Sequence, residues 1–454
     1  MQNTSYQNLI IGFGKAGKTL AGFLAKKGET VALVERSKER YGGTCINVAC
    51  IPSKSLEYSA RLSAAAGGDF AAKAARYRAA IAEKRRLTAM LREKNYAKVT
   101  GTGAVVIDGE ASFVDAHTVR IVGADGEQTV TADRIFINTG ALPFVPPIEG
   151  AAESTHVYTS ETMMELDELP EKLVIIGGGY IGLEFASYYA NFGSSVAVVQ
   201  DGDAFIPRED TEIAARVLQH TNNRGIHILM GAKVQRIEHS AGGANVVVQT
   251  ADGEKTLAAN AILIATGRRP NIEGLNLAAA GVAVTERGAI AVDEHLRTSV
   301  PHIWAMGDVA GSLQFTYISL DDFRIVKDTL FGKGERTTKN RGVVPYSVFL
   351  DPPLSRMGMT EEEARAAGFE VAVRKLAVAA IPKAQVLRKP AGLLKAVIDA
   401  KTDKILGAHL FCPESQEMIN IIKLAMDAGI TVGTLADAVY THPTMTEAFN
   451  DLFA

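Results

Sequence analysis

The sequence is poor in cysteine, in net charge and in long apolar runs. Its 454 residues include three cysteines and one tryptophan, too few thiols for the disulfide framework of a secreted protein, and this indicates a reducing compartment. The formal net charge of −3 gives no sign of a nucleic acid or a membrane surface as partner. No apolar run approaches the roughly 18 residues of a membrane span, and the N-terminus lacks a charged-then-apolar signal. We therefore expect a cytoplasmic protein.

Glycine and apolar residues are abundant. The chain holds 42 glycines, is 47% hydrophobic and 22% charged, which is typical of an α/β protein with tight turns rather than of a disordered or fibrous one. Its length suggests about three domains of ordinary size.

A first glycine-rich turn lies between two predicted strands. Residues 6–12 are typical of a buried strand, residues 18–28 carry helical periodicity, and residues 30–35 form a second strand that ends at Glu35. This order is typical of a dinucleotide-binding module, whose glycines let the backbone approach a pyrophosphate and whose acid accepts hydrogen bonds from a ribose. A glycine triplet alone is weak evidence, but the flanking strands and the acid favour binding over a plain turn. The glycines of this turn are Gly12, Gly14 and Gly17.

The same pattern returns in residues 172–200. In both modules 23 residues separate the first glycine from the residue that ends the second strand. That residue is now Gln200, which is neutral and does not repel a 2′-phosphate, although no arginine follows before Arg208. NADPH and NADH both stay open, and Gln200 favours NADPH. The glycines of the second turn are Gly177, Gly179 and Gly182.

Two cysteines lie five residues apart in the stretch GGTCINVACIPSK, residues 42–54. In a regular helix this offset separates the Cα atoms by about 7.5 Å along the axis, beyond the usual disulfide range of about 4.4–6.8 Å. A disulfide between Cys45 and Cys50 therefore needs an irregular helix start, with only Cys50 in regular helix. The spacing alone leaves two unpaired, buried thiols as the alternative.

Read whole, residues 42–54 resemble the redox-active motif of the pyridine nucleotide-disulfide oxidoreductases, the flavoproteins that include glutathione reductase, lipoamide dehydrogenase and mercuric reductase. Ala49 stands where the family usually has glycine. The resemblance covers nearly the whole chain. It implies an α/β protein with two doubly wound Rossmann-like nucleotide-binding domains of the glutathione-reductase type and a C-terminal α+β dimerisation domain. The implied domains are 1–150 (FAD-binding, first part), 151–272 (NAD(P)H-binding), 273–343 (FAD-binding, second part) and 344–454 (dimerisation).

The resemblance also implies the cofactors FAD and NADPH or NADH, and roles for individual residues. Cys50 would be the flavin-side thiolate, and Cys45 would be the exposed thiol that attacks the substrate. His442 and Glu447 would act as base and acid on the disulfide of the partner subunit, so that activity requires a homodimer. Lys54 and Glu184 would form an ion pair beside the flavin. The other implied cofactor contacts are Gly43, Thr44, Ala111, Thr139, Gly140 and Asp308 for FAD, and Tyr180 and Gly267 for the nicotinamide nucleotide.

The substrate is less constrained. Stretches such as IIGFGKAGKTLA and AMGDVAGSLQFTYISLDDFRIV are similar to bacterial flavoproteins of reactive-chlorine resistance within this family. The resemblance implies reduction of a small thiol-reactive oxidant in oxidative-stress defence, with hypothiocyanous acid as the first candidate and Cu(II) as a second. A dihydrolipoyl dehydrogenase or another low-molecular-weight disulfide reductase stays open, as does a non-catalytic redox sensor. The sequence offers no metal site, because its histidines and cysteines are scattered.

Overall fold

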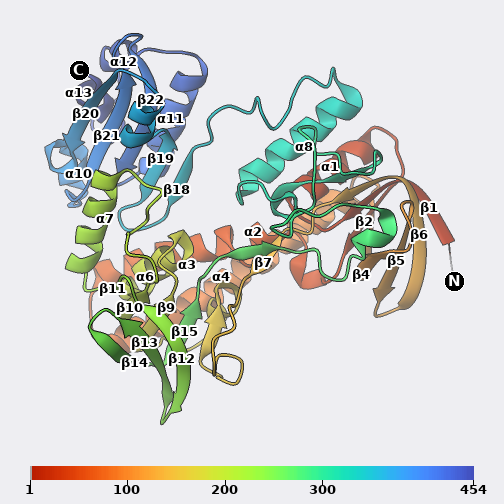
Figure 1. Cartoon of the computed structure of the whole chain (residues 1–454), viewed down its shortest axis with the longest axis horizontal. Helices are drawn as coiled ribbons and strands as arrows, with labels where there is room; N and C mark the ends of the chain where they lie inside the picture. The colour runs from red at the N-terminus through yellow and green to blue at the C-terminus, as the bar shows by residue number, and fades with distance from the viewer. Residues whose placement is uncertain (1–2) are drawn as a thin grey trace. The chain divides into compact units, whose positions relative to one another are not determined.

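The computed structural model describes residues 3–454, which form two compact units (Figure 1). The first unit consists of the chain up to Ser55, Ala79–Phe144 and Gly267–Arg341. The second consists of Leu56–Arg78, Val145–Thr266 and Gly342–Ala454.

A seven-stranded sheet forms the centre of the first unit, in the order β3-β2-β1-β6-β5-β4, with β17 also paired to β6. The core strands β1, β2 and β6 pair in parallel. Every residue of β2 is buried, as expected for a parallel strand covered on both faces. The strands are β1 (Asn3–Ile11), β2 (Val31–Glu35), β3 (Val105–Asp108), β4 (Glu110–Phe113), β5 (Thr118–Gly123), β6 (Gly126–Ile137) and β17 (Ile303–Ala305).

Helices α1 (Lys15–Lys26) and α8 (Thr316–Phe331) lie side by side in this unit (Figure 1). Leu20 and Leu24 of α1 share one apolar core with Ile325 of α8 and with Leu33 and Phe136 of the sheet. The remaining elements of the unit are α2 (Thr44–Asn47), the first residues of α3 (Cys50–Ala66), most of α4 (Phe70–Thr100), the short helices η1 (Lys38–Arg40), η2 (Leu277–Ala280) and η3 (Gly307–Ala310), and the paired strands β7 (Ala141–Pro143) and β16 (Arg268–Pro270). Residues 67–69 separate α3 from α4.

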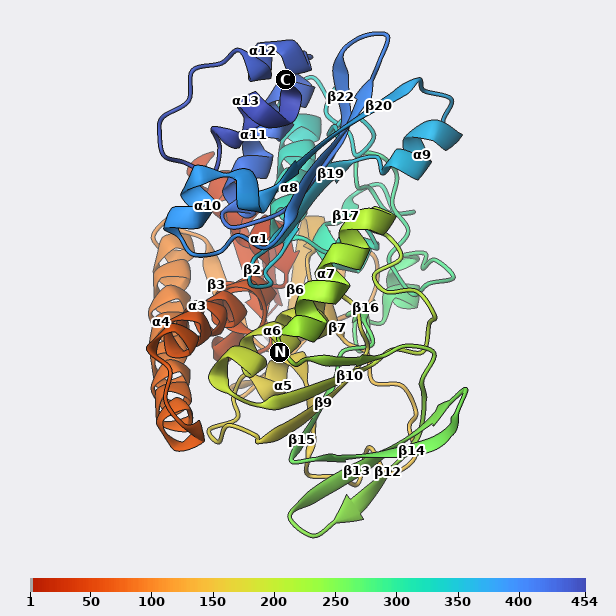
Figure 2. The same cartoon turned by 90° about the vertical axis from the view of Figure 1, so that its left-hand side faces the viewer.

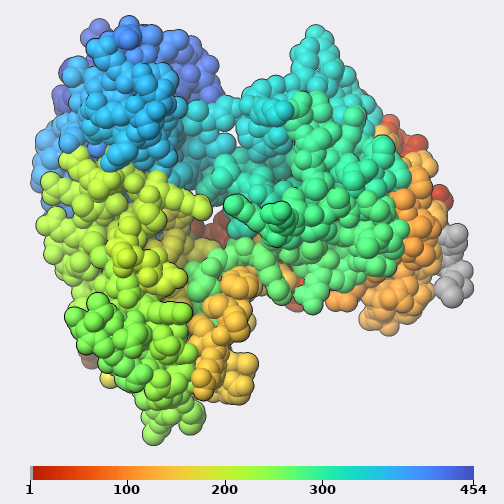
Figure 3. Space-filling view, in the orientation of Figure 1, coloured from red at the N-terminus to blue at the C-terminus, as the bar shows by residue number. Residues whose placement is uncertain are grey.

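The second unit contains a parallel sheet in the order β11-β10-β9-β15-β8. Its elements are β8 (Val157–Thr159), α5 (Ser160–Met163), β9 (Lys172–Ile176), α6 (Tyr180–Phe192), β10 (Ser195–Val199), α7 (Thr211–Asn223), β11 (His227–Leu229) and β15 (Ala261–Ile264). An antiparallel sheet of β12 (Lys233–Ser240), β13 (Gly243–Thr250) and β14 (Gly253–Ala259) follows β11 in the chain, and one end of it projects from the surface (Figure 3).

The C-terminal part of this unit is built on a sheet in the order β18-β19-β22-β21-β20. Side chains alternate between its faces: Leu394 and Leu410 pack with the core of α11 and α13, which cover one face (Figure 2), whereas Leu393 and Phe411 pack with α7 on the other. The elements are β18 (Tyr346–Val348), β19 (Leu354–Gly358), α9 (Glu361–Ala366), β20 (Val371–Ala377), η4 (Val378–Ala380), α10 (Pro382–Val386), β21 (Leu393–Asp399), β22 (Lys404–Phe411), α11 (Ser415–Asp427), α12 (Val432–Ala436) and α13 (Ala448–Phe453).

These elements confirm the expected α/β class, with a mixed sheet that has a parallel core in the first unit, a parallel sheet in the second unit and a C-terminal α+β part. In the described range, 3–454, no helix combines the length and the apolar character that crossing a bilayer requires.

A buried ion cluster fastens α7 to the C-terminal sheet. Lys395 of β21 is 3% exposed and Asp210, the N-cap of α7, is 0% exposed. The Lys395 Nζ lies 2.8 Å from Asp210 Oδ2 and 2.9 Å from Glu361 Oε2. Because removing one member of such a pair leaves a buried charge without compensation, the cluster makes a sharp stability test.

We expect Lys395→Met to lower the free energy of unfolding by about 3–5 kcal/mol, measured as a shift of the denaturation midpoint at fixed protein and flavin concentrations. The matched control is Lys375→Met on the neighbouring strand, whose partly exposed side chain pairs with Glu212 at 2.6 Å, and it should cost less than about 1 kcal/mol. Equal effects of the two substitutions would show that the cluster does not fasten α7.

Candidate active site

The two cysteines lie at a break between helices. The short helix α2 carries Cys45 and ends at Asn47, and the φ of −141° at the next residue, Val48, leaves the helical region. Helix α3 then begins at Cys50. The predicted irregular helix start is present, but the expectation that only Cys50 is helical is wrong, because the segment is a helical turn, a break and a second helix. Both cysteines are free thiols and half-buried, so the expected disulfide stays a prediction and Cys45 is less exposed than expected.

The environment of the pair separates the two thiols electrostatically. A hydrogen bond from the Cys45 thiol lowers the pKa of Cys50 to about 6, although burial opposes it, and the Thr316 hydroxyl and the Lys54 ammonium lower it further. The Thr316 Oγ1 lies 3.4 Å from the Cys50 Sγ. The same thiol-to-thiolate hydrogen bond, together with burial, raises the pKa of Cys45. Cys50 is therefore the thiolate of the pair at neutral pH. The sequence reasoning missed Thr316, although the stretch that contains it had been singled out.

Asn138, at the end of β6, organises the first glycine turn. Its Oδ1 accepts the Gly17 amide at 2.9 Å, and its Nδ2 donates to the Met306 carbonyl at 2.6 Å. A Cβ on Gly14 would lie 2.2 Å from Asn138 Oδ1, and one on Gly12 would lie 2.5 Å from the Asn138 carbonyl oxygen. These glycines are thus required by close packing against Asn138, a residue absent from the predicted site. The available signal was a polar residue directly after the apolar run 135–137 and before Thr139.

The two modules repeat one another closely. Glu35 Oε2 accepts the Phe13 amide at 3.0 Å, and Gln200 Oε1 accepts the Gly178 amide at 2.9 Å. A Cβ on Gly177 would lie 2.5 Å from the Ala265 carbonyl oxygen, just as a Cβ on Gly12 would lie 2.5 Å from the Asn138 carbonyl oxygen in the first module. The predicted strand-end residues therefore close their own glycine turns. Burial raises the pKa of Glu35, although three backbone amides lower it.

The turns fit the dinucleotides that the sequence predicts. Helix α6 has no side-chain N-cap and no acidic residue in its first turn, which leaves a helix N-terminus suited to phosphate groups. Helix α1 lacks both as well, but Ser319 and Asn138 accept the Ala16 and Gly17 amides, so these two donors are not available to a phosphate. A Cβ on Gly179 or on Gly267 would meet nothing within 4 Å, and Gly182 instead packs against the Gly177 carbonyl oxygen. The Asp308 carboxylate makes no side-chain hydrogen bond within residues 3–454, and burial raises its pKa. A buried carboxyl group without a side-chain partner fits the hydroxyl groups of a ribityl chain.

The remaining predicted flavin residues gather around the cysteine segment. A Cβ on Gly43 would lie 2.8 Å from the Gly14 Cα, and one on Gly140 would lie 3.4 Å from Thr44 Oγ1. Thr139 Oγ1 donates to the Asn271 carbonyl at 2.7 Å. Ala111 lies apart from this group, in β4, where it pairs with Ile121 and packs on the core of the first unit.

Tyr180, at the start of α6, is held by residues that the sequence reasoning missed. Its hydroxyl donates to Glu209 Oε1, and the Tyr346 hydroxyl donates to the same oxygen at 2.6 Å. Burial and the nearby Glu209 carboxylate raise the pKa of both tyrosines. Among the described residues, 3–454, none forms a hydrogen bond with the buried Glu209 Oε2. One carboxylate therefore fixes the orientation of the predicted nicotinamide-side ring.

The predicted base and its carboxylate partner meet near the C-terminus. His442 Nδ1 lies 2.7 Å from Glu447 Oε2, and Glu447 Oε1 accepts the Thr444 amide at 3.2 Å. The imidazole is largely exposed. Because a carboxylate accepts, the contact places the ring proton on Nδ1, which donates to Glu447, and leaves Nε2 as an acceptor. Glu184 Oε1 accepts the Phe349 amide at 2.8 Å, and its pairing with Lys54 stays a prediction. Cys412 is buried with its Sγ 3.8 Å from Met418 Sδ, which fits a packing role.

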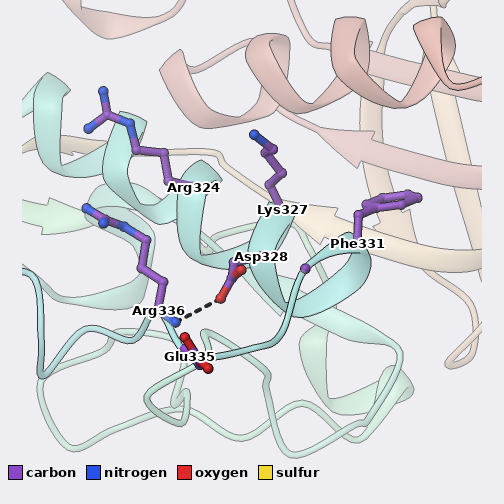
Figure 4. A pocket seen from close by; sticks show the side chains of 7 residues that line it. Arg324, Lys327, Asp328, Phe331, Glu335 and Arg336 are labelled. Carbon is purple, nitrogen blue, oxygen red and sulfur yellow. Dashed lines mark hydrogen bonds between the residues drawn. The ribbon is translucent and has the colours of Figure 1, made fainter.

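A surface pocket of about 510 Å³ lies at the end of α8, and none of its lining residues is a predicted site residue (Figure 4). Asp328 accepts the Arg336 amide at 2.8 Å across it. Its walls mix basic and acidic groups, and we assign it no role. The lining residues are Arg324, Lys327, Asp328, Phe331, Gly332, Glu335 and Arg336. Within the described part of the chain, no group of three or more His, Cys, Asp or Glu side chains is arranged to hold a metal ion.

The comparisons with known proteins establish the family. The family model "Pyridine nucleotide-disulphide oxidoreductase" matches residues 6–322, and the model of the family's dimerisation domain matches residues 344–453. The chain therefore belongs to the pyridine nucleotide-disulphide oxidoreductases. It is an oxidoreductase of the flavoprotein disulfide reductase type, a family that works with FAD and NAD(P)H, and it carries the family's dimerisation domain.

Among individual proteins, the chain is 49% identical to the probable pyridine nucleotide-disulfide oxidoreductase RclA of Escherichia coli, with 99% of each chain covered. It is 34% identical to dihydrolipoyl dehydrogenase of Mycobacterium bovis over 99% of this chain and 98% of the relative. The solved structure of the HOCl-induced flavoprotein disulfide reductase RclA from E. coli matches with a TM-score of 0.93 at 48% identity over 99% of both chains. The chain is thus an RclA-like flavoprotein disulfide reductase.

The thiol pair gives a prediction about pH. Because the Cys45 hydrogen bond is the largest cause that lowers the pKa of Cys50, Cys45→Ala should raise that pKa by at least about one unit. In the reduced wild-type protein the first thiolate should appear as pH rises through about 6. Thiolate ultraviolet absorbance over a pH titration measures both values, and Cys412→Ala is the control, since that thiol is buried elsewhere. An unshifted Cys50 titration in Cys45→Ala would refute the assigned cause.

Proposed function

We propose that this protein reduces a small thiol-reactive oxidant, hypothiocyanous acid first, at the Cys45 and Cys50 pair. The observation that carries the proposal is the geometry of the pair, in which two free thiols lie at a helix break and the Thr316 Oγ1 lies 3.4 Å from the Cys50 Sγ. The lowered pKa of Cys50 and the raised pKa of Cys45 support it. Similarity to an HOCl-induced reductase supports a role in oxidative-stress defence. A structure of that relative as a Cu(II) complex keeps Cu(II) as a second candidate substrate.

The reaction would begin at Cys45. Once its proton is removed, the Cys45 thiolate attacks the sulfur of hypothiocyanous acid, a sulfur–sulfur bond forms, and the sulfur–oxygen bond breaks with loss of water after protonation. The Cys50 thiolate then attacks the Cys45 sulfur, closes the disulfide and releases thiocyanate. When bound, FAD and NAD(P)H supply the electron pair that reopens the disulfide. The cofactor residues proposed above would hold these groups, with Asp308 at the ribityl chain and Gly179 at the pyrophosphate.

The His442 and Glu447 pair would move the proton. With its Nδ1 proton directed at Glu447, the imidazole offers Nε2 as the acceptor for the Cys45 proton. By family resemblance, the His442 Nε2 of one subunit accepts the proton from the cysteine pair of the partner subunit. We therefore propose a homodimer whose sites are each completed by the other chain.

Steady-state oxidation of NADPH and of NADH with hypothiocyanous acid, Cu(II), lipoamide and glutathione disulfide tests the substrate. We expect the highest kcat/KM with hypothiocyanous acid, and loss of that activity to background in Cys45→Ser, which keeps the fold but removes the nucleophile. Preference for lipoamide would make the protein a dihydrolipoyl dehydrogenase type instead, and absence of turnover with every oxidant would favour a redox sensor.

Heterodimers test the completion in trans. Cys45→Ser and His442→Ala chains are co-expressed with different tags, and the mixed dimer is isolated. Action across the interface leaves one intact site in that dimer, so we expect about half of the wild-type turnover per dimer. Each parent homodimer should be nearly inactive, with His442→Ala reduced about 10²–10⁴-fold. A mixed dimer as inactive as the parent homodimers would show that His442 and Glu447 act on the cysteines of their own chain.

A further inference from the structure

Lys18 is a half-buried lysine that the mechanism above does not use. It lies in the first turns of α1, and its Nζ donates to the Gly42 carbonyl oxygen at 2.9 Å. Gly42 is buried and lies three residues before Cys45. The ammonium is therefore tied to the same short segment that carries the attacking thiol.

This segment is held firmly. Asn47 Nδ2 donates to the carbonyl oxygens of Tyr41 and Gly43, at 2.9 and 3.0 Å. The Arg92 Nε in turn donates to Asn47 Oδ1 at 3.1 Å. Because the backbone between Tyr41 and Asn47 is fixed from both sides, the position of the Lys18 ammonium relative to Cys45 is fixed as well.

The charges around Lys18 are of one sign. Lys15, one turn earlier on α1, and Lys98 on α4 are the cations that lower its pKa, and with burial as the largest cause they bring it to about 8. Cys45 raises the pKa of Lys18, and Lys18 lowers that of Cys45, so the two groups are close enough to interact. Within residues 3–454 none of these three lysines forms an ion pair with a carboxylate. A half-buried ammonium with two further cations nearby and no ion pair to a carboxylate attracts small anions.

We propose that Lys18, with Lys15 and Lys98, forms a small-anion site beside Cys45 that recruits the anionic form of weak-acid oxidants and protonates them for attack. For hypothiocyanite, the class of oxidant in the proposed function on which this assignment rests, Lys18 gives its proton to the oxygen and yields hypothiocyanous acid. The Cys45 thiolate attacks the sulfur, the sulfur–oxygen bond breaks, and the departing hydroxide takes a proton from solvent. Lys18 regains its proton from solvent. A lysine that titrates near neutral pH can give and regain a proton in each turnover.

Alkylation of Cys45 tests the anion site without using any physiological oxidant. Flavin-loaded dimers in a Cys50→Ser background are treated with iodoacetate, which is anionic, and with iodoacetamide, which is neutral, and the Cys45 adduct is quantified by mass spectrometry. Both reagents attack the same thiolate, so their rate ratio cancels any change in thiolate fraction. We expect Lys18→Met to lower the iodoacetate-to-iodoacetamide ratio at least about fivefold, whereas Lys18→Arg, which keeps the charge, stays within about twofold of the parent.

The control is Lys26→Met, an exposed lysine at the far end of the same helix, which should leave the ratio unchanged. A ratio unaffected by Lys18→Met overturns the proposal, and so does loss of bound flavin from that variant, which would place Lys18 in the flavin site. In steady state, Lys18→Met should raise the KM for hypothiocyanous acid and leave that for neutral lipoamide unchanged. If hypothiocyanous acid is not a substrate, the proposed function fails while the alkylation ratio still decides the anion site.

Discussion

The buried side chain of Asn138 is the interaction on which the first nucleotide module depends. It binds the Gly17 amide of α1 and the Met306 carbonyl at the end of β17, and its own backbone lies against Gly12. A buried amide of this kind must satisfy its donors and its acceptor together, or it costs more than an apolar residue would. The requirement fixes the glycine turn against the segment that presents Asp308. The cysteine segment follows, because Gly43 packs directly on Gly14.

The sequence predicted what local pattern can predict. Both modules and the irregular start of α3 follow from periodicity, glycine spacing and the steric limits of a disulfide. The missed residues act through contacts between distant parts of the chain. Thr316 is 266 residues from Cys50, and Tyr346 is 137 residues from Glu209. No periodicity carries such a pairing, and a serine, threonine or tyrosine at a helix start has many ordinary explanations.

The two modules share a skeleton but differ at the helix N-terminus. In the first, side chains of Asn138 and Ser319 take the Gly17 and Ala16 amides. In the second, Ala265 follows the corresponding strand and offers no side chain that could do so, and Gly179 faces open space. The first turn is thus built into the protein interior, whereas the second keeps its donors available.

The redox pair shows why proton movement must set the order of events. One hydrogen bond lowers the pKa of Cys50 and raises that of Cys45, so the reduced pair holds a single proton at neutral pH and holds it on the thiol that has to attack. Removing that proton without compensation would place two thiolates side by side, which like-charge repulsion opposes. A base for Cys45 and a positive charge beside it are therefore both needed. An imidazole directed by Glu447 can supply the first, and the Lys18 ammonium can supply the second.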